Sequence, residues 1–157
     1  MGGRGSKSGK AGREASAIKS LTDTPISKLQ RFVSKSKTSD VIKAYDQLSQ
    51  KETVQMTNEE KMVRAVVVDE LLSGGNLLYD PKTGDYKKHQ NANEIVFYNG
   101  KSYKIKGVEK VESQTGEMVE FAEAEFYYNG KFSPVKNYPI RKSLAKEYTK
   151  KRQQIRR

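Results

Sequence analysis

The apolar residues of this chain change from helical to strand-like spacing at Gly74-Gly75, and this change constrains the fold more than any other feature. Before the two glycines, apolar residues recur three or four positions apart, as in amphipathic helices. After them, apolar and polar residues alternate and turn sequences follow one another closely, as in antiparallel strands. The sequence therefore predicts an α+β fold in which N-terminal helices pack on an antiparallel β-meander.

Three helices are predicted before Gly74. The first begins at Thr24-Pro25 and runs to about residue 34, because proline is well tolerated at the first helical position. The second follows a short polar link. The third begins at a capping box, in which the hydroxyl of Thr57 and the carboxylate of Glu60 each accept the other residue's backbone N–H.

Six strands, joined as an antiparallel meander, are predicted after the glycines. Asn99-Gly100 and Asn129-Gly130 each lie between a tyrosine and a lysine, and Asn-Gly is the strongest short signal for a hairpin turn. Residues 117–126 fit either a strand with a β-bulge near Phe121 or a short Ala/Glu-rich helix, and both readings stay open. The strands are expected at 76–79, 86–89, 94–98, 101–111, 118–128 and 131–135.

A basic helix is predicted after Pro139, with Ile140, Leu144 and Tyr148 on one face and Lys and Arg over most of the other. The opposite end of the chain is rich in Gly, Ser and Lys and offers nothing to bury, so it is expected to be disordered. The predicted organisation is a basic tail over 1–22, one domain over 23–149, and a basic tail over 150–157 that continues the last helix.

Net positive charge is confined to the two ends. Residues 1–20 carry five basic residues and one acidic residue, residues 136–157 carry nine and one, and the stretch between carries 16 and 17. Clustered Lys and Arg repel one another until phosphates or carboxylates neutralise them, which favours nucleic acid or a ribonucleoprotein as partner. The predicted binding residues are Lys142, Lys146, Lys150, Lys151, Arg152, Arg156 and Arg157, with Arg4, Lys7, Lys10 and Arg13 as a second contact.

The residue types favour a binding protein over an enzyme. There is no Cys for a disulfide or a thiolate zinc site, and the single histidine, His89, cannot supply a paired-His metal motif. Glu120, Glu123 and Glu125 include enough carboxylates for an acid–base pair, but an alternating strand makes them a solvated acidic face or partners of the basic helix. No cofactor, metal or small-molecule substrate is predicted.

Tyrosines accompany lysines in the predicted strands, and two readings of them stay open. They can stack on bases beside phosphate-binding lysines, as in sheets that bind single strands, or they can pack within the sheet. The tyrosines concerned are Tyr98, Tyr103, Tyr127, Tyr128 and Tyr138, and the nearby lysines are Lys101, Lys104, Lys131 and Lys136.

The opening Met-Gly-Gly-Arg-Gly-Ser-Lys-Ser-Gly resembles the start of many small accessory proteins from phages and mobile elements of Gram-positive bacteria, some of them encoded among head-morphogenesis genes. The chain is also similar in type to phage inhibitors of host defence, including anti-CRISPR proteins, which are often small, cysteine-free and non-catalytic. The resemblance covers a low-complexity segment and transfers no functional residue.

The expected function is that of a non-enzymatic phage or mobile-element protein that binds nucleic acid or a ribonucleoprotein through its basic ends, as an inhibitor of a CRISPR-type effector. The alternative is a virion or head-assembly protein that contacts packaged DNA or acidic capsid partners. No apolar run reaches the roughly 18 residues that span a bilayer, and no secretory signal pattern is present. The host cytoplasm or the virion is therefore the expected location, with no membrane partner.

Overall fold

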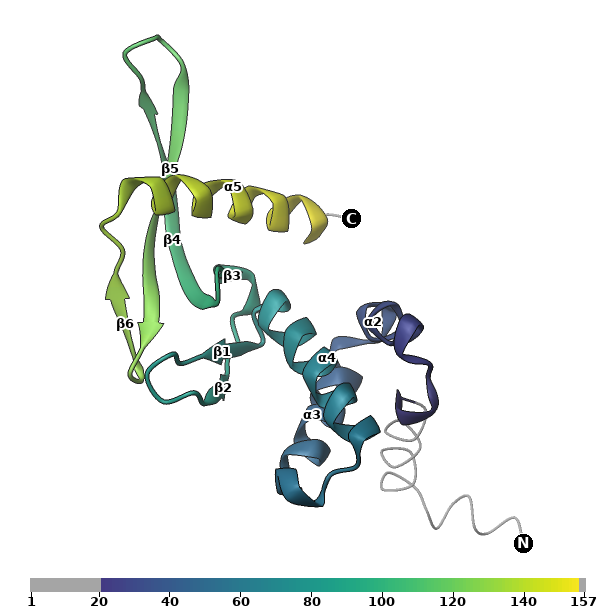
Figure 1. Cartoon of the computed structure of the whole chain (residues 1–157). Helices are drawn as coiled ribbons and strands as arrows, with labels where there is room; N and C mark the ends of the chain where they lie inside the picture. The colour runs from purple at the N-terminus through teal and green to yellow at the C-terminus, as the bar shows by residue number, and fades with distance from the viewer. Residues whose placement is uncertain (1–20, 156–157) are drawn as a thin grey trace, which may run out of the picture. The chain divides into compact units, whose positions relative to one another are not determined.

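The structure is a computed structural model that describes residues 21–155 (Figure 1). The chain divides into two compact units, one ending at Leu71 and one beginning at Leu72. Helices come first, antiparallel strands follow, and a helix ends the chain, so the predicted α+β class is confirmed.

The N-terminal unit is helical. It contains α2 (Ile26–Lys35), α3 (Thr38–Ser49), the short 3-10 helix η1 (Thr53–Gln55) and most of α4 (Asn58–Gly74). Its buried apolar residues recur at helical spacing, as predicted from the sequence. They include Leu29, Val33, Val41, Ala44, Leu48, Val63 and Val67.

The predicted capping box begins α4. The Thr57 amide donates to Oε1 of Glu60 over 3.0 Å, and the Glu60 amide donates back to Oγ1 of Thr57 over 3.0 Å. The ammonium of Lys51 lies 2.7 Å from the other carboxylate oxygen. The hydrogen bonds from Lys51 and Thr57 lower the pKa of Glu60, so the cap stays ionised at neutral pH.

The C-terminal unit holds two antiparallel sheets. Strands β1 (Leu77–Tyr79) and β2 (Tyr86–Lys88) form a two-stranded sheet. After the 3-10 helix η2 (Ala92–Glu94), a four-stranded sheet follows in the order β3-β4-β5-β6. Its strands are β3 (Ile95–Tyr98), β4 (Lys101–Glu112), β5 (Met118–Tyr128) and β6 (Lys131–Pro134). Helix α5 (Tyr138–Ile155) crosses the long β4–β5 hairpin, whose tip extends past it (Figure 1).

The segment 117–126 is a strand, but its predicted bulge near Phe121 is wrong. The pairing of β4 with β5 shifts register between Ile105 and Gly107, so the irregularity lies on the partner strand. Strand β5 therefore alternates without interruption, which places Ala122 and Ala124 together in the core under α5. Their small side chains let the helix approach the sheet closely.

Both Asn-Gly sequences form the predicted hairpin turns, with positive φ at Asn99 (49°) and Asn129 (52°) and at the glycines that follow. The buried carboxylate of Asp80 accepts the amides of Asn129 and Gly130, each over 2.8 Å, and that of Lys82 over 2.9 Å. Burial alone would raise the pKa of Asp80, but these hydrogen bonds outweigh it and the pKa is lowered. An ionised Asp80 thus ties the β1–β2 turn to the β5–β6 turn.

Candidate nucleic-acid interface

Helix α5 is held firmly against the four-stranded sheet. Two of its own residues, Leu144 and Ala145, are almost completely buried in the core. Arg141 adds polar contacts: its Nη2 lies 2.6 Å from Oε1 of Glu109, and its Nε donates to the carbonyl of Ala122 over 2.8 Å. The glutamate that pairs with this helix is therefore Glu109 on β4. Sequence reasoning looked to Glu120, Glu123 and Glu125, which form no ion pair with α5 among the described residues.

Lys151 anchors the other end of α5. Its ammonium donates to the carbonyls of Gly74, Ala92 and Ile95 over 3.0, 2.6 and 2.5 Å. Burial lowers the pKa of Lys151 to about 8, so the side chain still carries its charge at neutral pH. Lys151 was predicted from the sequence to bind a partner, whereas in the structure its ammonium donates its hydrogen bonds to carbonyls of the same chain.

Gly75 makes room for this contact. Its φ is +86°, and a Cβ at this position would lie 2.3 Å from the Ala92 carbonyl oxygen and 2.8 Å from Nζ of Lys151. Any other residue would therefore both strain the backbone and displace the ammonium. The glycine pair at which the apolar spacing changes thus also completes the Lys151 site.

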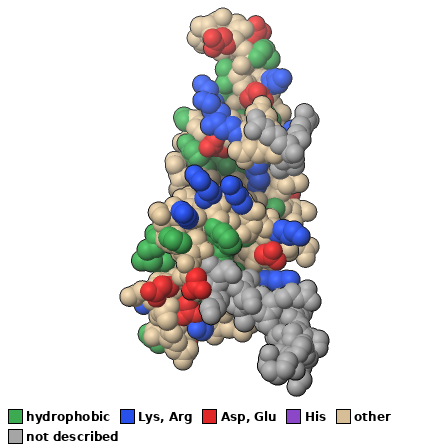
Figure 2. Space-filling model, turned by 90° about the vertical axis from the view of Figure 1, so that its right-hand side faces the viewer, with side chains coloured by type: hydrophobic (Ala, Val, Ile, Leu, Met, Phe, Trp, Pro, Cys, Tyr) green, Lys and Arg blue, Asp and Glu red, His purple; other side chains and the backbone are tan. Residues whose placement is uncertain are grey.

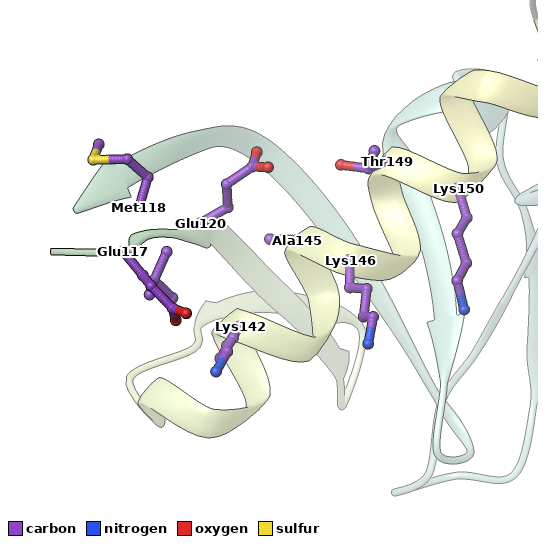
Figure 3. A pocket seen from close by; sticks show the side chains of 9 residues that line it. Glu117, Met118, Glu120, Lys142, Ala145, Lys146, Thr149 and Lys150 are labelled. Carbon is purple, nitrogen blue, oxygen red and sulfur yellow. The ribbon is translucent and has the colours of Figure 1, made fainter. Parts of the chain in front are cut away.

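The exposed side of α5 carries a basic stripe, defined here as Lys142, Lys146 and Lys150. All three side chains are exposed, and they extend from the same side of the helix (Figure 3). Lys150 lies 3.5 Å from Glu147, whereas Lys142 and Lys146 form no ion pair within the described part of the chain. Because four residues of helix rise about 6 Å, the stripe presents three ammonium groups over about 12 Å.

A groove of about 390 Å³ lies beside the stripe. One wall is α5, with the stripe, Ala145 and Thr149, and the other is formed by residues 117–120, where the turn leads into β5. Glu120 extends to the opposite side of the helix from the lysines, whereas Glu117 extends to the same side (Figure 3). The carboxylates therefore lower the local positive potential without pairing with the stripe. Acidic side chains also mark the hairpin end at the top of Figure 2, above a group of Lys and Arg at the level of α5.

The remaining predicted basic residues are of two kinds. Arg152 is exposed and lies over the ring of Tyr148, 5.6 Å from its centroid, so it extends the charge of α5 towards the C-terminus. The others lie outside the described residues. They are Arg156 and Arg157 at the C-terminus, and Arg4, Lys7, Lys10 and Arg13 at the N-terminus.

The groups considered for catalysis lie apart on the sheet or are already paired. His89 Nε2 is 3.1 Å from Oε1 of Glu94, and its ring contacts Phe132. Alternation along β5 directs Glu120 to the opposite face from Glu123 and Glu125. Within residues 21–155, no group of three or more His, Asp or Glu could hold a metal ion. No helix in the same range is long and apolar enough to cross a membrane.

Comparisons with protein families, with curated proteins and with solved structures found no match for this chain. The site is therefore interpreted from its own chemistry.

Proposed function

We propose that the protein binds nucleic acid, alone or within a ribonucleoprotein, through the basic stripe of α5, and that it is not an enzyme. The observation that carries this proposal is the separation of roles along one helix. The charged groups of Arg141 and Lys151 are hydrogen-bonded within the fold, whereas Lys142 and Lys146 are exposed and unpaired among the described residues. A row of exposed ammonium groups attracts a polyanion, and the packed helix that carries them needs no ordering of its backbone when the polyanion binds.

The spacing of the stripe fits a phosphate backbone. Phosphates of one strand of duplex DNA follow one another about every 3.4 Å along the axis, so a 12 Å stripe runs beside three or four of them. Lysine ammonium groups act as point charges and contact phosphates without reading bases. The affinity is therefore expected to depend strongly on salt concentration and only weakly on base sequence.

Of the two glutamates of the groove, Glu117 extends to the same side of α5 as the stripe and Glu120 to the opposite side (Figure 3). Phosphates would be attracted by the stripe and repelled by both carboxylates. The backbone is thus expected to follow the lysines and to stay out of the groove beside Glu117 and Glu120. The resemblance of the N-terminus to phage proteins suggests two sources for the polyanion, a host-defence ribonucleoprotein or packaged DNA, and pull-down from infected cells would distinguish them.

Fluorescence anisotropy with labelled oligonucleotides tests the proposal. The variant Lys142→Gln/Lys146→Gln/Lys150→Gln should bind roughly 100-fold more weakly at about 0.15 M salt, from about 0.9 unit of log–log slope per lost phosphate contact on duplex DNA. The matched control is Lys28→Gln/Lys35→Gln/Lys43→Gln, three exposed lysines of α2 and α3 with the same total charge. Equal weakening by both variants would contradict a role for the stripe, and no binding by the unmodified chain would contradict the function.

A further inference from the structure

The two Tyr-Asn-Gly-Lys sequences place a row of aromatic and basic side chains across the end of the four-stranded sheet. Tyr98 on β3 lies opposite Lys101 on β4, and Tyr128 on β5 lies opposite Lys131 on β6. The β4–β5 register pairs Tyr103 with Phe126, and its continuation by two residues brings Lys101 opposite Tyr128. We call Tyr98, Lys101, Tyr128 and Lys131 the tyrosine–lysine row.

All four side chains lie on one face of the sheet. Residues directly opposite each other in an antiparallel pair share a face, which joins Tyr98 to Lys101 and Tyr128 to Lys131. Phe126 links the two halves, because the Lys101 ammonium lies 5.6 Å from its ring centroid and the ring of Tyr128 lies 6.2 Å from it. Tyrosine and lysine therefore alternate over four neighbouring strands.

The row is accessible and held in place. Lys101 and Lys131 are exposed, Tyr128 is 42% exposed, and Tyr98 is half-buried at the edge of the core beneath α5. Asp80 fixes the turn between Tyr128 and Lys131 by accepting the amides of Asn129 and Gly130. The backbone between Tyr128 and Lys131 is thus held by contacts within the fold.

We propose that this face of the sheet binds single-stranded nucleic acid, with bases stacked on Tyr98 and Tyr128 and phosphates at Lys101 and Lys131. Neighbouring strands lie about 4.8 Å apart, so the two tyrosines are separated by about 10 Å, with a lysine beside each. Aromatic rings bind any base by stacking, and lysines neutralise the adjacent phosphates. Phe126 takes no base, because Lys101 already lies over its ring.

The inference rests on the proposed function and adds the kind of nucleic acid, because a duplex hides the base faces that the tyrosines would contact. The alternation of cations with rings also favours a nucleic acid over an acidic peptide, which offers carboxylates but no rings to stack. Charge complementarity and stacking thus point to the same occupant.

Binding of the full chain to oligothymidylate, oligouridylate and a duplex of equal length tests the inference. The unmodified chain should prefer the single strands, and binding of either one supports stacking. Tyr98→Leu and Tyr128→Leu should each weaken single-strand binding about tenfold, whereas Tyr98→Phe and Tyr128→Phe, which keep the ring, should retain it. The Phe variants separate loss of the hydroxyl from loss of the ring, and circular dichroism of the Leu variants checks their folding.

A spectroscopic reporter gives a second measurement. The chain has no Trp, so Tyr128→Trp introduces a single one, whose fluorescence oligothymidylate should quench and the duplex should not. Equal affinity for both forms, with folded Leu variants unaffected, would overturn the inference while binding through the basic stripe persists. Poly-glutamate serves as a polyanion without bases. If the Leu variants lost as much affinity for poly-glutamate as for oligothymidylate, the inference would also be overturned. Absence of salt-dependent binding to any nucleic acid would remove the proposed function as well.

Discussion

The charged groups of Asp80 and Lys151 form hydrogen bonds with backbone groups of the C-terminal unit. Asp80 accepts three backbone amides that join two turns, and Lys151 donates to three carbonyls at the end of α5. Both satisfy backbone groups that would otherwise lose their hydrogen bonds on burial. Eight of the nine tyrosines lie in this unit, so tyrosine fluorescence follows its unfolding.

Asp80→Asn should lower the urea midpoint of the C-terminal unit at pH 7, because an amide offers one acceptor oxygen where the carboxylate offers two. The pKa of Asp80 is lowered in the fold, so its contribution is present above the ordinary pKa of about 3.9 and is lost as the pH falls through the folded value. The difference between variant and wild type should therefore narrow below about pH 4. Asp85→Asn, an exposed change in the same turn, is the control, and equal midpoints at pH 7 for Asp80→Asn would contradict the account.

The neighbouring residues Lys150 and Lys151 should show opposite phenotypes. Lys151→Met removes the donor of three carbonyls and should cost about 1–3 kcal/mol of unfolding free energy with little effect on nucleic-acid affinity. Lys150→Met changes an exposed side chain and should weaken binding with little effect on stability. Urea titration and anisotropy measured on both variants check this, and a stable Lys151→Met with impaired binding would refute the division of roles.

Among the elements, the β4–β5 hairpin carries carboxylates that lower the positive potential beside α5. Glu117→Gln/Glu120→Gln should strengthen oligonucleotide binding roughly 2- to 30-fold, because each of the two surface charge interactions contributes about 0.2–1 kcal/mol. The control Glu52→Gln/Glu59→Gln makes the same change in charge at exposed positions of the N-terminal unit. If both pairs gave the same gain, net charge rather than the groove would explain it.

Most elements could be predicted from the sequence because their signals are local. The capping box at Thr57 and Glu60 and the two Asn-Gly turns depend on residues within a few positions of each other, and all three formed as predicted. The bulge was misplaced because it lies in β4, and which strand accommodates a register shift depends on the pairing partner. That information is not local.

The candidate site was only partly predictable for the same reason. Helical spacing separates the exposed Lys142, Lys146 and Lys150 from the buried Leu144, and the sequence shows that pattern directly. The internal role of Lys151 depends on carbonyls 56 to 77 residues away. The tyrosine–lysine row likewise depends on strand register, although the repeated Tyr-Asn-Gly-Lys was its visible signal.

Over the whole molecule, the net charge of +11 is distributed unevenly. Residues 21–71 of the N-terminal unit hold eight basic and eight acidic residues, whereas α5 alone holds six basic residues and one acidic residue. Two of those six, Arg141 and Lys151, are engaged with the fold. The charge available to a partner on α5 is therefore concentrated in the stripe and Arg152.

The dependence of oligonucleotide affinity on salt tests this account most directly. For the full chain, log Kobs should fall linearly with log salt, and Lys142→Gln/Lys146→Gln/Lys150→Gln should reduce the slope by about 2 to 3 units, from about 0.7 unit per contact on single strands or 0.9 on duplex DNA. A slope near zero for the full chain, or one that the triple substitution leaves unchanged, would contradict the claim that the basic stripe binds nucleic acid.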